Sequence, residues 1–295
     1  MTESAGLTSY AHAIALDTPF DRGRGAARDR AAFVNDVAEW LARDAGMKVS
    51  DLPRDLHAHR TLITHLLTIR PPRPFPAEVL RKLDALFAEA AAERPDVTAS
   101  DLLTQASALT TIDETRLCLW RGDITTLALD AIVNAANADL LGCFQPGHSC
   151  IDNAIHTVAG PRLREDCQRI REIQGHREPT GTAKVTRAYF LPSRFVLHTV
   201  GPIVGNGRVT PSHEAALADC YRACLELAAE VHARSLAFCA ISTGVFGYPK
   251  VPAATVAICT VNDWLRRHPH AFDLVVFNVF SEQDVAAYRD AGGLS

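Results

Sequence analysis

The chain has 295 residues, of which 47% are hydrophobic and 22% charged, so it can form one large domain or a domain with an extension. This composition excludes disordered and collagen-like chains. The formal net charge of -4, from 30 Lys and Arg against 34 Asp and Glu, comes without a dense basic stripe, and we expect no nucleic-acid partner.

The N-terminal third of the chain has the apolar spacing of helices. Between Arg28 and Ser107, apolar residues recur at intervals of three and four in three stripes: Phe33, Val37, Trp40 and Leu41; Leu62, Ile63, Leu66 and Leu67; Val79, Leu80, Leu83, Leu86 and Phe87. The prolines between Arg70 and Pro76 separate the second stripe from the third, and Pro76 suits the first position of a helix. A short fourth helix is expected to begin at Thr98, with Asp101 in its first turn.

After about residue 111 the pattern changes to short β-branched runs that alternate with helical segments, which predicts an α/β fold. The expected strands are Arg116 to Trp120, Ala131 to Asn134, Phe195 to Thr199, Leu236 to Ile241 and Leu274 to Phe280. The expected helices lie near Ile151 to Ala159, His213 to His232, Val251 to His268 and Ser281 to Ala291. We therefore expect a helical N-terminal extension over residues 1–110 and an α/β domain over residues 111–295.

The start of the chain, from Met1 to Asp17, lacks the pattern of a secretory signal, and no run of about 18 apolar residues follows it. We expect a cytoplasmic protein with no membrane partner. Eight cysteines are too few for a disulfide scaffold in a chain of this size, so they are interpreted as buried thiols, metal ligands or a nucleophile.

In open α/β sheets, ligands bind beyond the carboxyl ends of the strands. Four segments of this chain are expected at such ends. They are Gly122 to Thr125, Asn134 to Asn137, Gly142 to Ile151 and Ile241 to Gly247. The small residues and glycines of the last segment allow backbone amides to approach a diphosphate, and Phe246 is placed to stack on a ribose. Each segment alone is also compatible with an ordinary turn.

The order GDIT, IVNAANADLLG, IDNAIH, HTVGP and ISTGVFGYP resembles the macrodomain family of ADP-ribose-binding modules. The resemblance implies a three-layer α/β/α fold with a cleft for ADP-ribose. It further implies that Asp123 accepts a hydrogen bond from adenine with Ile124 beside it, and that Asn137 contacts the distal ribose. The diphosphate and ribose cradle would be formed by Ser242, Thr243, Gly244, Val245 and Phe246.

One loop departs from the usual macrodomain pattern. Instead of a run of glycines, the chain has Cys143, His148 and Cys150 in one short segment. Thiolates and imidazole are the ligands that zinc prefers, and three protein ligands leave a fourth position open for substrate or water. The loop resembles that of the zinc-containing branch of macrodomains, whose members also have a helical N-terminal extension with an RPP stretch.

Other interpretations of these residues remain open. The two cysteines of the loop can be buried thiols, and a fourth ligand such as His156 or Cys167 would close the metal site and make it structural. His156 is more simply interpreted as support for Asp152 or packing under the loop. Gly181, Lys184 and His198 are interpreted as structural, and the remaining cysteines as core residues: Cys118, Cys220, Cys224, Cys239 and Cys259.

The favoured function is a Zn²⁺-dependent hydrolase that removes mono-ADP-ribose from protein side chains. Asp152, which its setting aligns with the aspartate of hydrolytic macrodomains, would orient or deprotonate water while Asn137 holds the ribose. The alternatives are a reader module that binds ADP-ribose without cleaving it, and an enzyme with structural zinc acting on small ADP-ribose esters. The resemblance suggests a lipoyl-carrier protein modified by a sirtuin-class transferase as the substrate.

Overall fold

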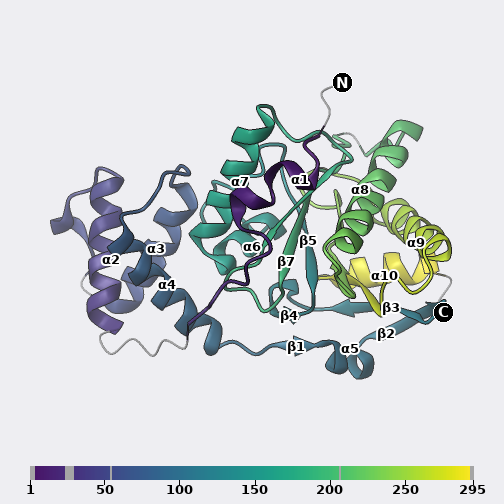
Figure 1. Ribbon diagram of the computed structural model, residues 1–295, viewed down its shortest axis with the longest axis horizontal. Coiled ribbons are helices and arrows are strands. Elements are labelled where there is room, and N and C mark those ends of the chain that lie inside the picture. The colour runs from purple at the N-terminus through teal and green to yellow at the C-terminus, as the bar shows by residue number, and fades with distance from the viewer. Residues whose placement is uncertain (1–3, 24–29, 54, 206, 293–295) are drawn as a thin grey trace.

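The computed structural model describes residues 4–23, 30–53, 55–205 and 207–292. Its central strands are β2 (Ser107–Ile112), β3 (Thr115–Arg121), β5 (Ala131–Ala135), β6 (Ala183–Arg187), β7 (Phe195–Thr199), β8 (Ser235–Phe238) and β9 (Leu274–Val279). They form a seven-stranded mixed sheet in the order β2-β3-β9-β8-β5-β7-β6, in which β2 and β6 are the antiparallel edge strands (Figure 1). The inner strands are all parallel, so their carboxyl ends lie at one edge of the sheet.

Helices cover both faces of the sheet, which confirms the expected three-layer α/β/α fold. On one face lie α6 (Ile151–Ala159) and α7 (Pro161–Gln174), and on the other α8 (Pro211–Glu230), α9 (Lys250–Arg267) and α10 (Glu282–Gly292) (Figure 1). Because both faces are covered, the central strands are almost fully buried: every residue of β9 is buried, as in other parallel sheets.

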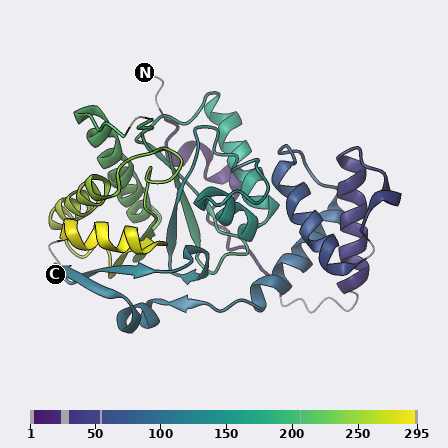
Figure 2. The same ribbon diagram turned by 180° about the vertical axis from the view of Figure 1, so that it is seen from behind.

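The N-terminal helices α2 (Arg30–Asp44), α3 (Leu56–Ile69) and α4 (Ala77–Ala92) lie beside the sheet and its layers (Figures 1 and 2). They have their own apolar cluster, which includes Val37, Leu41, Ile63, Leu66 and Leu83. The segment before them, with α1 (Leu7–Tyr10) and the 3-10 helix η1 (His12–Ile14), packs instead on the core of the α/β body through Tyr10 and Ile14. The division at residue 110 stays a prediction.

The connecting region contains α5 (Ala99–Gln105), which begins with the expected Thr98 and Asp101 pair in a reciprocal capping box. The two-residue strand β1 (Val97–Thr98) pairs in parallel with β4 (Leu127–Ala128) outside the main sheet, and the 3-10 helix η2 (Val49–Asp51) joins α2 to α3. Pro76 is not the first helical residue but the residue before it. No helix within the described ranges combines the length and the hydropathy that a membrane span requires.

Candidate active site at the carboxyl edge of the sheet

Most of the predicted site segments do meet at one edge of the sheet. Asp123 follows β3, Asn137 follows β5, and Ser242 to Phe246 follow β8, so the sheet itself brings them to the same edge. The 3-10 helix η3 (Ile124–Thr126), which begins directly after Asp123, contacts α6. Because α6 starts at Ile151, the first turn of this helix belongs to the same site.

Asp152 is the buried carboxylate of the site, with 6% of its surface exposed. Its Oδ1 accepts a hydrogen bond of 2.8 Å from Asn134 Nδ2, and its Oδ2 accepts one of 3.3 Å from Asn137 Nδ2. Burial raises the pKa of Asp152 to about 6, although the bond from Asn134 and the charge of Arg164 act in the opposite direction. At neutral pH this group is therefore ionised and a stronger base than an exposed aspartate.

Asn137 is held in place by its own turn. Its Nδ2 also donates to the carbonyl of Gly142 at 3.0 Å, and its Oδ1 accepts from the backbone amide of Asp139 at 3.0 Å. The side chain therefore connects the start of the cysteine loop to Asp152. The described structure thus brings Asn137 and Asp152, two of the predicted site residues, into contact.

Cys143, His148 and Cys150 converge in this loop, and their Sγ and ring nitrogen atoms all lie within 4.8 Å of one another. Cys143 Sγ is 3.5 Å from His148 Nδ1, and Cys150 Sγ caps α6 by accepting from the Asn153 amide at 3.4 Å. Burial raises the pKa of Cys150 to about 11, so this thiol needs a cation nearby to stay deprotonated at neutral pH. The three half-buried donors fit a single zinc-sized ion.

Neither of the two residues considered as a fourth ligand belongs to this group. His156 is buried one turn below Asp152, with its Nε2 3.6 Å from Asp152 Oδ1, too far for a hydrogen bond. Cys167 Sγ lies 3.9 Å from His198 Nε2 in the core. His156, Cys167 and His198 form a second, fully buried group under the sheet edge.

The Ser242 to Gly247 loop folds on itself. Tyr248 N donates to Ser242 O at 3.0 Å, Gly247 N donates to Gly244 O at 3.0 Å, and Ser242 adopts a φ of 65°. Within the described ranges the backbone amides of Gly244, Val245 and Phe246 have no protein acceptor. Successive free amides of this kind can bind an anion such as a diphosphate.

Asp123 and Ile124 occupy different environments. Asp123 is exposed, and its Oδ1 accepts from the Thr125 backbone amide at 2.9 Å and from the Thr125 hydroxyl at 2.6 Å. Ile124, in contrast, is buried in the main core. The remaining cysteines are buried as expected except Cys259, which is exposed on α9, so that interpretation was wrong for this residue.

Comparison with known proteins agrees with the α/β/α fold described above. Residues 133–257 match the family model described as Macro domain. A protein of Treponema medium named "Protein-ADP-ribose hydrolase" is 47% identical over 238 residues, which span 81% of this chain and 89% of the relative. The chain belongs to the macrodomain family.

One further curated protein and one solved structure are similar to this macrodomain. A Staphylococcus aureus protein, also named "Protein-ADP-ribose hydrolase", is 42% identical over 86% of this chain and 94% of its own length. The solved Oceanobacillus iheyensis macrodomain with ADP is 40% identical, with a TM-score of 0.55 over 62% of this chain and 92% of that one. The 258 aligned residues of the Staphylococcus aureus protein outnumber residues 111–295, so its similarity extends into the N-terminal region.

Two residues of this macrodomain site were not assigned from the sequence. Asn134 lies within the IVNAAN motif, but its contact with Asp152 depends on the end of β5 facing the first turn of α6. Arg164 lies in α7, which was not predicted because half of its residues are charged. The sequence does contain one indication of this helix, which is the helical spacing of the buried Leu163, Cys167 and Ile170.

Proposed function

We propose that this macrodomain hydrolyses the bond between ADP-ribose and a protein side chain, with zinc as its metal ion. The observation that supports the proposal most strongly is the position of Asp152. Its carboxylate begins the helix that Cys150 caps, and it shares the Asn137 side chain with the start of the cysteine loop. Relatives named as protein-ADP-ribose hydrolases over most of this chain support the same reaction.

Cys143, His148 and Cys150 would hold the zinc ion. When bound, zinc lowers the pKa of a coordinated water or hydroxyl and stabilises negative charge as a Lewis acid. Asn153 supports this loop, since its Nδ2 donates to His148 O at 3.0 Å while its backbone amide donates to Cys150. Both contacts hold the ligands against the first turn of α6.

Asp152 would orient and deprotonate the attacking water. Its two oxygens are held by different asparagines, which fixes the direction of its remaining lone pairs. Asn137 would contact the distal ribose at the same time as it holds Asp152. A base that is fixed and buried in this way performs proton transfer without first having to reorganise.

The other end of the nucleotide would lie along the sheet edge. The free amides of Gly244, Val245 and Phe246 would bind the diphosphate, with Ser242 and Thr243 completing the loop. Asp123 would accept a hydrogen bond from the adenine amino group, with Ile124 packed beneath it. A lipoyl-carrier protein modified by a sirtuin-class transferase stays the predicted source of the ADP-ribosyl group.

The experiment is an incubation with proteins mono-ADP-ribosylated on aspartate, glutamate or arginine, followed by quantification of released ADP-ribose. Wild type should release ADP-ribose from at least one acceptor class, and Asp152→Asn should bind ADP-ribose but turn over at least about 100-fold more slowly. Binding without release by wild type would identify a reader module instead. Release from small ADP-ribose esters but not from protein would support the third alternative.

A further inference from the structure

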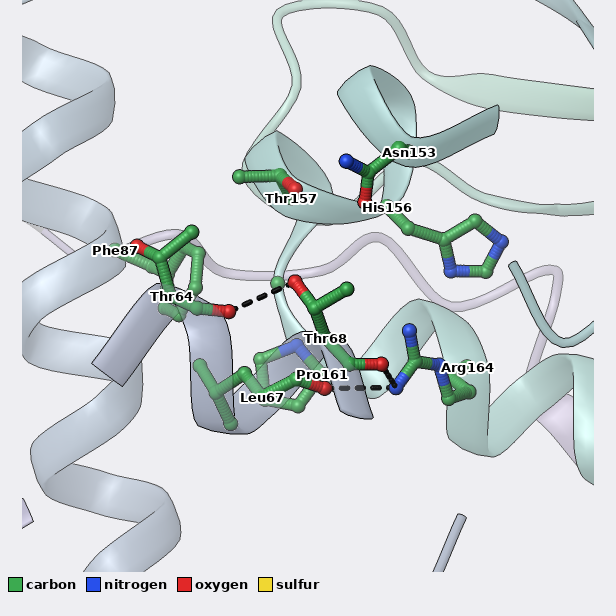
Figure 3. A pocket seen from close by; sticks show the side chains of 10 residues that line it. Thr64, Leu67, Thr68, Phe87, Asn153, His156, Thr157, Pro161 and Arg164 are labelled. Atoms are coloured by element: carbon green, nitrogen blue, oxygen red, sulfur yellow. Dashed lines mark hydrogen bonds between the residues drawn. The ribbon is translucent and has the colours of Figure 1, made fainter. Parts of the chain in front are cut away.

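Arg164 connects the N-terminal helices to the candidate active site. It lies on α7 with only 9% of its surface exposed. Its Nη1 donates to three backbone carbonyls of the extension: Leu67 O at 2.7 Å, Thr68 O at 3.1 Å and Arg70 O at 3.0 Å. Figure 3 shows the guanidinium directed at the end of α3, across the pocket between α3 and α6.

The proline stretch explains why these carbonyls are free. In a continuing helix, the carbonyls of Leu67 and Thr68 would accept from the amides four residues later. Those residues are Pro71 and Pro72, which have no N–H to donate. The RPP stretch therefore ends α3 with two carbonyls that need another donor, and the partial negative charge of a helix end favours a guanidinium there.

The other side of Arg164 faces the site. Its guanidinium carbon lies 4.6 Å from the ring centroid of Phe144, the residue after the metal ligand Cys143. One side chain thus contacts both the extension and the cysteine loop.

The carbonyls that Arg164 contacts are fixed within the extension. The Arg70 side chain donates from Nε to Asp44 Oδ2 at 3.0 Å, and its guanidinium carbon lies 3.9 Å from the Phe75 ring centroid. Asp44 ends α2, and Phe75 packs against the extension's own apolar cluster. The carbonyls at the end of α3 are therefore held in place, and their position is set by the packing of the helical extension.

We propose that Arg164 is a positioning residue through which the helical extension holds the Cys143 to Cys150 loop. The inference rests on the proposed function, because it assigns the extension to the hydrolytic site. It predicts that losing the guanidinium weakens zinc binding and kcat together. All three carbonyls bind the one nitrogen Nη1, which an ammonium could replace, but only a planar guanidinium also lies over the Phe144 ring at the same time.

The test compares Arg164→Met, Arg164→Lys and Arg164→Ala with Arg162→Met in the full-length protein. Arg162 lies on the same helix and also binds the extension, through two bonds to Asp84 of 2.9 and 2.7 Å, but among the described residues it does not bond to the cysteine loop. Zinc affinity is measured by competition with a chromogenic chelator. Turnover is measured as kcat and KM on the substrate that wild type cleaves.

Arg164→Met and Arg164→Lys should weaken zinc binding and lower kcat by about 10- to 100-fold each, with KM nearly unchanged. Added guanidinium ion should restore part of the loss in Arg164→Ala but not in Arg162→Met. Equal losses in the Arg164 and Arg162 variants, or no rescue, would overturn the proposal. If wild type has no hydrolase activity, the proposed function fails, and the zinc affinities still decide whether Arg164 positions the loop.

Discussion

Asn134 Nδ2 lies 2.8 Å from Asp152 Oδ1, so the second-last residue of β5 holds the carboxylate in the first turn of α6. The same amide nitrogen is 3.1 Å from His198 Nδ1 on the neighbouring strand β7. Asn134 is completely buried. The candidate base is therefore tied directly to the hydrogen-bonded core of the sheet.

Asn134→Ala should leave Asp152 and His198 without this donor. Removing one partner of a buried polar pair costs about 1–3 kcal/mol of unfolding free energy, and misplacing the base should lower kcat by at least about tenfold. Urea unfolding and turnover measure the two effects. Asn278→Ala removes a single bond of 2.9 Å to Gly122 O and serves as the control for stability. Unchanged turnover in Asn134→Ala would contradict this role.

Cys143→Ser should lose the zinc ion, because serine is a much poorer ligand for zinc than a thiolate. Metal analysis should find about one zinc per chain in wild type and much less in the variant, and hydrolysis should fall with the metal. The matched control is Cys259→Ser, since Cys259 is an exposed thiol on α9. Full hydrolysis by metal-free protein would remove zinc from the mechanism.

His198 should make the fold acid-sensitive. Burial lowers the pKa of His198 to about 3, whereas an unfolded histidine titrates near 6.5. Above pH 6.5, His198 is neutral in both the folded and the unfolded chain, so it does not reduce the unfolding free energy. As the pH falls below 6.5, only the unfolded state takes up the proton, so the unfolding free energy should drop by about 1.4 kcal/mol per unit, or about 2 kcal/mol at pH 5.

Urea unfolding of His198→Gln between pH 7 and pH 5 tests this expectation. The unfolding free energy of the variant should fall less steeply with decreasing pH than that of wild type. The difference in slope should correspond to about one proton fewer taken up on unfolding. His57→Gln, at an exposed position of α3, is the matched control for the histidine-to-glutamine change itself. If His198→Gln and wild type lose stability in parallel, other groups are responsible for the acid sensitivity.

Gly201→Ala should disturb the proposed diphosphate loop. A Cβ at Gly201 would lie 2.0 Å from Ser242 Oγ and 2.9 Å from Ile241 Cγ2, so the start of the loop would have to move. We expect ADP-ribose affinity to fall by about tenfold or more in calorimetric titration, because displaced amides lose their hydrogen bonds. Gly205→Ala has nothing within 4 Å of its new Cβ and should bind normally. Equal affinities for the two variants would place the diphosphate elsewhere.

Much of this arrangement could be predicted from local sequence. The bounds of β7 and α6 agree with the predicted ones, because both segments have uninterrupted apolar spacing between clear turn residues. β6 was missed because Lys184 interrupts a short apolar run. In the structure the Lys184 side chain is buried and forms an ion pair of 2.9 Å with Glu178. α7 was missed because its charged residues outnumber its apolar ones.

The contacts that connect the parts of the site could not be predicted in the same way. Arg164 binds carbonyls 94 to 97 positions earlier in the chain, and nothing in the local pattern of α7 identifies those acceptors. The RPP stretch could be predicted to end a helix, but not to supply a binding site for a distant guanidinium. Such relationships depend on how the extension packs against the α/β body.

The most direct test of the central claim is a crystal structure of the protein grown with zinc and ADP-ribose. The account predicts one zinc ion bound by Cys143, His148 and Cys150 at about 2.0–2.3 Å, with its open coordination position turned toward the distal ribose beside Asp152. A zinc ion closed by a fourth side chain, or a ribose bound away from Asp152 and these three ligands, would contradict it.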